Sequence, residues 1–166
     1  MPEAPEGSGS HPLTLIMPIR KDADLEALWG IIESNKPTIG ETLDQVGTVH
    51  YSRFMLFDAS ADNFQPSLRS PGGPYRLAVI TTYDGDFDLY IEDFALRLGN
   101  VFDAILGFTT DGGGLVPVEE NLVAFTDWIR NNDASQHDLR GEPVGNPTQY
   151  GAYPHSVQRI KANCGG

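Results

Sequence analysis

A histidine and an arginine stand inside a stretch that otherwise has the composition of a β-strand, and a carboxylate follows the next such stretch. The first, TVHYSRFMLF (48–57), holds His50 and Arg53 among aromatic and aliphatic residues. The second, YRLAVITTY (75–83), runs directly into Asp84. The imidazole of a histidine titrates near a pH of about 6.5, so it can serve as a general acid or base, and a carboxylate beside it can orient its ring. These three residues are the candidate catalytic residues.

Pairing of the two strands brings the histidine and the aspartate together. If the strands are antiparallel neighbours with Asp58 opposite Tyr75, His50 falls opposite Tyr83 and lies close to Asp84. The sequence therefore predicts a polar cluster at one edge of the sheet, beside the start of the helix that follows.

Alternation along the first strand separates the histidine from the arginine. Successive side chains point to opposite faces, so His50 and Arg53 face one cavity only if a β-bulge intervenes. Arg53 can instead bind a carboxylate or enolate oxygen of a substrate through its fork of donors. The aromatic residues expected to line the substrate site are Tyr51, Phe54, Tyr83 and Tyr90.

Each candidate residue also has a structural interpretation, which the sequence leaves open. Asp84 and Asp86 flank a glycine at the start of a helix, where carboxylates accept hydrogen bonds from free N–H groups. His50 suits a hydrogen-bonded position at the start of a strand, and Arg53 suits an ion pair with a carboxylate.

The remaining elements follow from the spacing of apolar residues and from the turn formers between them. Proline at position 37 interrupts the first helical pattern, so a turn or two is expected to continue in a new direction to residue 47. The expected order is a strand at 13–20, a helix at 22–35, strand 48–57, a loop at 59–74, strand 75–83, a long helix within 84–108, a further helix at 117–132 and a short last strand near 152–160.

This order predicts an α+β fold of the ferredoxin-like split βαβ type. It implies a four-stranded antiparallel sheet with helices on one face, one extra helix, and an open sheet face that a second copy is expected to cover. We expect a disordered tail at 1–12 and a single domain at 13–162.

On this element order, the chain resembles the dimeric α+β barrel superfamily, in which two ferredoxin-like subunits join their sheets around a cavity. The resemblance implies a homodimer and a small-molecule enzyme, such as a monooxygenase or cyclase of secondary metabolism, using His50 with Asp84 or Arg53. A haem-binding, peroxidase-like protein with His137 or His155 as ligand is one alternative, and a non-catalytic ligand-binding or dimerisation module is another. No cofactor and no metal site is predicted, since the Cys/His spacing of structural zinc sites is missing.

Charge and composition narrow the partners. The 166 residues carry 23 acidic against 11 basic side chains, a net charge of −12, which repels nucleic acid and anionic membranes. The one cysteine allows no internal disulfide, and no apolar run reaches the roughly 18 residues of a membrane span. We therefore expect a cytoplasmic protein with a small-molecule ligand, and neither nucleic acid nor membrane as a partner.

Overall fold

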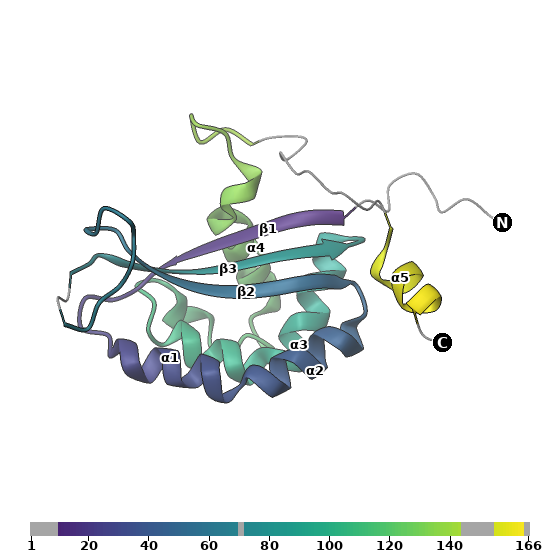
Figure 1. The fold of residues 1–166 in the computed structure, drawn as a ribbon, viewed down its shortest axis with the longest axis horizontal. Helices are drawn as coiled ribbons and strands as arrows, with labels where there is room; N and C mark the ends of the chain where they lie inside the picture. Colours follow the sequence, from purple (N-terminus) through teal and green to yellow (C-terminus); the bar gives the residue numbers. More distant parts are fainter. Residues whose placement is uncertain (1–9, 70–71, 144–154, 165–166) are drawn as a thin grey trace.

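The computed structural model describes residues 10–69, 72–143 and 155–164, which form an α+β fold around one antiparallel sheet (Figure 1). The sheet has three strands in the spatial order β1-β3-β2, so the last strand along the sequence is the central one. The strands are β1 (Ser10–Pro18), β2 (Val49–Asp58) and β3 (Tyr75–Asp84). Because β1 begins at Ser10, the structured part includes the last three residues of the predicted tail, while residues 1–9 lie outside the described residues.

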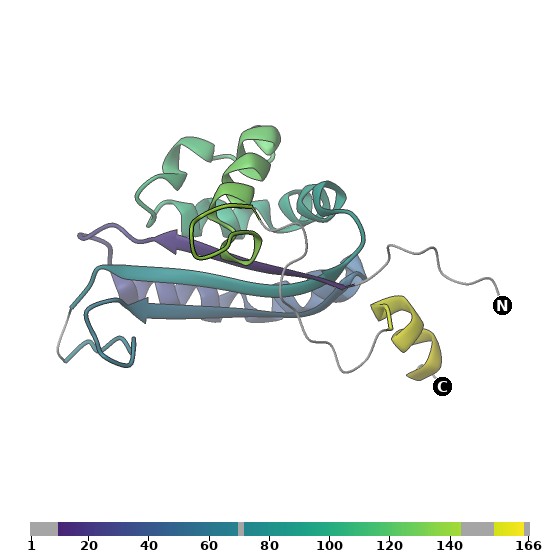
Figure 2. The same ribbon diagram turned by 90° about the horizontal axis from the view of Figure 1, so that it is seen from above.

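Helices cover one face of this sheet. Seen from the side, α1, α2 and α3 lie beneath the strands (Figure 1); seen from above, α1 and α2 lie under the strands, whereas α3 and α4 lie toward the side of β1 (Figure 2). The predicted break at Pro37 is confirmed, because a second helix begins beside it. The helices are α1 (Leu25–Ser34), α2 (Lys36–Val46), α3 (Phe87–Leu106), α4 (Leu122–Asn132) and α5 (Val157–Cys164), with short 3₁₀ turns η1 (Gly112–Leu115) and η2 (Ala134–Gln136).

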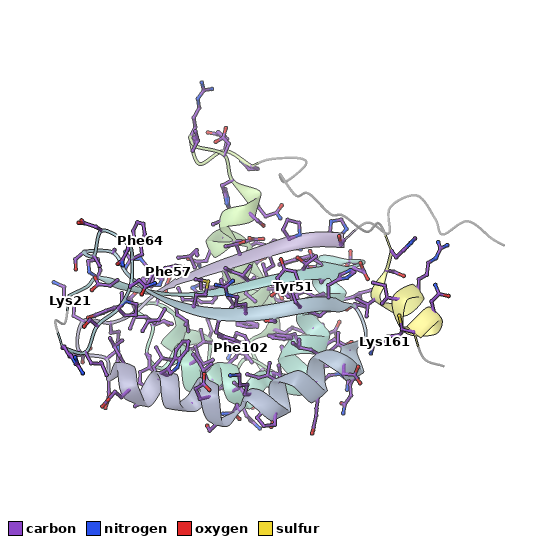
Figure 3. All side chains as sticks on the ribbon, viewed as in Figure 1. Lys21, Tyr51, Phe57, Phe64, Phe102 and Lys161 are labelled. Atoms are coloured by element: carbon purple, nitrogen blue, oxygen red, sulfur yellow. The ribbon has the colours of Figure 1, made fainter. Side chains whose placement is uncertain are left out.

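The core lies between the sheet and α3. Alternate residues of β1 and β3, among them Leu15 and Leu77, are fully buried against it. Phe102 of α3 sits between the sheet and the helices (Figure 3), with its ring 5.0 Å from that of Phe94 and 5.8 Å from that of Phe125 in α4. Burying large aromatic side chains is the main source of stability in such a layer. The three-four spacing of apolar residues in 84–108 thus predicted the central helix of the fold.

The prediction of a four-stranded ferredoxin-like sheet is wrong, and the dimeric barrel expected from such sheets loses its basis. The fourth strand was expected near 152–160. Residues 152–154 lie outside the described residues, and from Val157 onward the chain is the helix α5. Among the described residues, the buried backbone N–H of Val157 donates to Asp84, the Val157 side chain is buried, and Lys161 pairs with Asp44 of α2. Contacts so distant in sequence are invisible to local patterning.

The two outer strands differ in what lies along their free edges. Along β1, Asp133 forms an isolated bridge with Leu15, and its carboxylate accepts the backbone N–H of Thr14 at 2.9 Å. Along β2, no described strand pairs with the outer edge. Among the helices of the described residues, none combines the length and apolar character that a membrane span requires.

Candidate functional site

The structure brings His50 and Asp84 into direct contact at one end of the sheet. The predicted register is confirmed where the strands run regularly, since Asp58 pairs with Tyr75. At the other end of the pair, Nε2 of His50 lies 2.8 Å from Oδ1 of Asp84. The side chains are 20% and 11% exposed, so the pair is shielded yet reachable from solvent.

A β-bulge decides which way the histidine points. The register slips between Val49 and Tyr51, so Val49 takes the place opposite Tyr83 and His50 becomes the extra residue. Val49 is buried on the helix side, whereas Tyr51 is 55% exposed on the other face, where Figure 3 labels it. The bulge therefore restarts the alternation after His50.

As a consequence, His50 lies on the same face of the sheet as Arg53, from which strict alternation had separated it. This open face is the one that α1, α2 and α3 do not cover. Arg53 pairs with Ile80, which shares a strand face with Asp84 because the two are an even number of residues apart. His50, Tyr51 and Arg53 thus lie on the side of the sheet away from α1, α2 and α3. The bulge, without which the histidine and the arginine could not share a face, is present.

Asp84 is held from more than one direction. Its Oδ2 accepts the backbone N–H of Val157, the first residue of α5, at 2.8 Å. Its own backbone N–H donates to the carbonyl of Thr48 at 2.7 Å. Asp84 does not cap α3, because that role belongs to Asp86, whose carboxylate accepts the N–H of Leu89 at 3.1 Å. The carboxylate of Asp84 is thereby fixed in position to orient the His50 ring.

Three of the predicted substrate-binding residues lie on the other side of the sheet. Tyr83 and Tyr90 are each 4% exposed, and their rings stack with centroids 4.4 Å apart. Burial, followed by the nearby charge of Asp133, raises the pKa of Tyr83 to about 12, and burial also raises the pKa of Tyr90. Phe54 packs against the same core. Of the four predicted residues, only Tyr51 shares the face of the His50–Asp84 pair.

The other histidines do not join this pair. His137 places its Nδ1 3.0 Å from the backbone carbonyl of Asp133, the ring of His11 lies 5.6 Å from that of Tyr83, and His155 is exposed. Within the described ranges, no three His, Cys, Asp or Glu side chains cluster closely enough to hold a metal ion.

Among the hollows that the described residues line, two lie away from this pair, between β2 and the helix pair α1 and α2. The larger, of about 520 Å³, lies between the start of α1, Leu56 of β2 and Leu68 of the following loop. The smaller, of about 420 Å³, lies between α2 and residues 52–54 of β2. Trp29 lines both. These hollows were not predicted from the sequence, although a tryptophan on the apolar face of a helix is a signal for them.

Arg53 contributes to the lining of the smaller hollow at the free edge of β2, although its side chain leaves the strand on the open face, opposite to those of Ser52 and Phe54. Its side chain is exposed and makes no ion pair or hydrogen bond with the residues that the structure describes.

No family model matches the sequence, and no curated protein and no solved structure matches it.

Proposed function

We propose that the protein is an enzyme that moves a proton to or from a small molecule bound on the open face of the sheet beside His50. The observation that carries this proposal is the 2.8 Å contact between His50 Nε2 and Asp84 Oδ1 on a bulge of an edge strand. A bulge leaves its extra residue outside the regular ladder and is common beside active sites.

The chemistry follows from the two ring nitrogens. Asp84 accepts a hydrogen bond from Nε2, which fixes the tautomer and leaves the lone pair of the neutral ring on Nδ1. Nδ1 makes no hydrogen bond to any described residue, so it is the atom that would take a proton from a substrate and return it. His50 is then the catalytic residue and Asp84 the positioning residue. Tyr51, exposed on the same face, would contact the substrate.

The experiment measures proton exchange, which is detected whether or not the product differs from the substrate. The full chain is incubated in D₂O with a panel of small carbonyl compounds, and mass spectrometry records deuterium gained at carbon. We expect exchange into at least one compound, a loss of about a hundredfold or more in His50→Ala, and an altered pH profile in Asp84→Asn. Asp86→Asn, two residues away in the cap of α3, is the matched control and keeps the wild-type rate.

A folded His50→Ala protein that exchanges at the wild-type rate contradicts the proposal. The proposal is also contradicted if the wild-type protein catalyses deuterium exchange into none of the compounds in the panel.

We also propose that the protein forms a homodimer in the cytoplasm through the end of the open face that holds Phe57, away from His50. Phe57 and Phe64 meet edge to face with centroids 6.5 Å apart at one end of β2 (Figure 3), and Phe64 is 55% exposed. Exposed aromatic residues at an open sheet face support burial against a second copy. Sedimentation velocity tests this: Phe64→Ser should shift the mass from dimer to monomer, and a monomeric wild-type protein would contradict it.

A further inference from the structure

We propose a second, independent ligand site: the hollows between edge strand β2 and helices α1 and α2 bind a monocarboxylic acid with an apolar chain. This site does not include His50 or Asp84, and the inference does not depend on the proton-transfer proposal.

The size and the neighbouring positions of the hollows suit such a ligand. Volumes of about 520 and 420 Å³ fall within the range of about 300–1,000 Å³ of small-molecule sites. Both hollows are lined by Trp29, so they are neighbours. Along β2, Leu56 lines one and Ser52 the other, and at about 3.3 Å per residue these positions are about 13 Å apart. The two neighbouring hollows, together called the groove, follow one another along β2, as an extended acyl chain requires.

The larger hollow has mainly apolar walls. Leu25 of α1, Leu56 of β2, Leu68 of the loop and Trp29 line it, and Glu26 and Ser67 are its polar lining residues. Leu68 is 64% exposed and Trp29 36% exposed, so apolar surface is left in contact with solvent here. Covering that surface with an alkyl chain is favourable.

The smaller hollow has the polar groups. Lys36 and Arg53 line it together with one acidic residue, Glu33. Lys36 forms only an exposed ion pair with Glu33, at 3.4 Å, which contributes little. Arg53 has no described partner, in a chain whose net charge is −12. The Arg53 side chain leaves edge strand β2 on the open face, so its guanidinium would reach round the free edge to contact a carboxylate in the hollow through two parallel hydrogen bonds.

A buried hydroxyl supplies the second polar contact. Ser52 Oγ is shielded from solvent and has no hydrogen-bond partner among the described residues, although Ser52 lines the hollow. Leaving a buried hydroxyl unsatisfied is costly, so such a group commonly indicates a missing partner. A carboxylate oxygen in the hollow would provide that partner.

A peptide is the rival occupant, since the free edge of β2 invites strand addition. A strand added there would lie in the plane of the sheet. Both hollows lie below that plane, between the sheet and the helices, and Ser52 faces the helix side together with Phe54 and Leu56. The position of the hollows therefore favours a small molecule.

The test titrates decanoic acid into the full chain, with calorimetry for affinity and tryptophan fluorescence for location. Of the two tryptophans, Trp29 borders both hollows, so binding should shift its emission to the blue and Trp29→Phe should abolish that shift while calorimetric binding remains. Arg53→Gln should weaken decanoate binding by about tenfold or more, and should leave decanol binding unchanged. Arg140→Gln, at an exposed arginine outside the groove, is the matched control and should bind decanoate as the wild type does.

Two results would overturn the inference. One is that the wild-type protein binds no decanoate. This includes the case in which a titration with an extended peptide that has a free C-terminus shifts the amide NMR resonances of β2, so that a peptide is the occupant. The other is binding that persists unchanged in Arg53→Gln, or a fluorescence shift that survives Trp29→Phe, because either places the ligand elsewhere.

Discussion

Replacing Asp84 with alanine should release α5 and destabilise the protein at the same time. The carboxylate makes two hydrogen bonds of 2.8 Å, one with the imidazole of His50 and one with the buried backbone N–H of Val157. A hydrogen bond to a charged group contributes about 1.5–3 kcal/mol. Taking the lower figure for each bond, we expect Asp84→Ala to lower the free energy of unfolding by about 3 kcal/mol.

The destabilisation caused by Asp84→Ala should be largest in α5. Besides the bond to Asp84, the described contacts of α5 are the burial of Val157 and the pairing of Lys161 with Asp44, which is exposed. Such pairs contribute little. Hydrogen exchange of the amides in Val157–Cys164 should therefore accelerate to the rate of an open peptide, while α3 keeps most of its protection. Asp84→Asn retains an oxygen that can accept from Val157 and should lose only about 1 kcal/mol.

Urea unfolding and native-state hydrogen exchange measure the two effects. The control is Asp86→Ala, which removes an exposed helix cap at a cost of about 1 kcal/mol and should leave α5 protected. If Asp84→Ala loses less than about 1 kcal/mol, or if α5 stays protected, the carboxylate does not hold the helix and the reasoning is refuted.

Tyr83, Asp58 and Phe102 each allow a further prediction. The pKa of Tyr83 rises to about 12 in the folded state, above the unfolded value of about 10, so its contribution to the free energy of unfolding is complete below pH 10 and is lost as the pH rises toward 12. Tyr83→Phe should therefore shift the midpoint of alkaline unfolding, followed by circular dichroism, to higher pH, and an unchanged midpoint would contradict this. Hydrogen bonds from Ser60 and Gly73 lower the pKa of Asp58 in the folded state, so its contribution to stability is present above the unfolded pKa of about 4 and is lost as the pH falls below that value. An acid protease should therefore cut loop 59–74 faster as the pH drops, whereas it should cut the loop of an Asp58→Asn protein fast at every pH. Phe102→Ala should lower the free energy of unfolding by about 3–5 kcal/mol, and a urea midpoint close to that of the wild type would show that the side chain is not packed as described.

Much of the fold follows from local patterns. Three-four spacing of apolar residues predicted α1, α3 and α4, because a helix must bury one face. Strand composition and the turn formers of 59–74 predicted β2 and β3 and their register, in which Asp58 meets Tyr75. These elements depend on interactions between residues near in sequence, or on a hairpin whose pairing the pattern constrains. The contact between His50 and Asp84 followed from that register.

Other features depended on contacts between distant residues. The helix α5 forms where a strand was expected, since its first N–H finds the carboxylate of Asp84, 73 residues earlier. The bulge at His50 is set by Val49, which enters the core opposite Tyr83 and leaves the next residue without a partner on β3. Neither the helix α5 nor the bulge at His50 can be recognised from nearby residues. Each depends on which distant residue accepts a backbone hydrogen bond or packs against an apolar side chain.

The sequence by itself determined an acidic α+β chain, the helices with strong periodicity, and the meeting of an imidazole with a carboxylate at a strand end. Only the tertiary structure decided that the sheet has three strands, that Tyr83 and Tyr90 belong to the core, and that Trp29 borders a groove beneath β2. The physical reason is that periodicity records which side of an element is buried, whereas the partner that buries it is chosen by the whole chain.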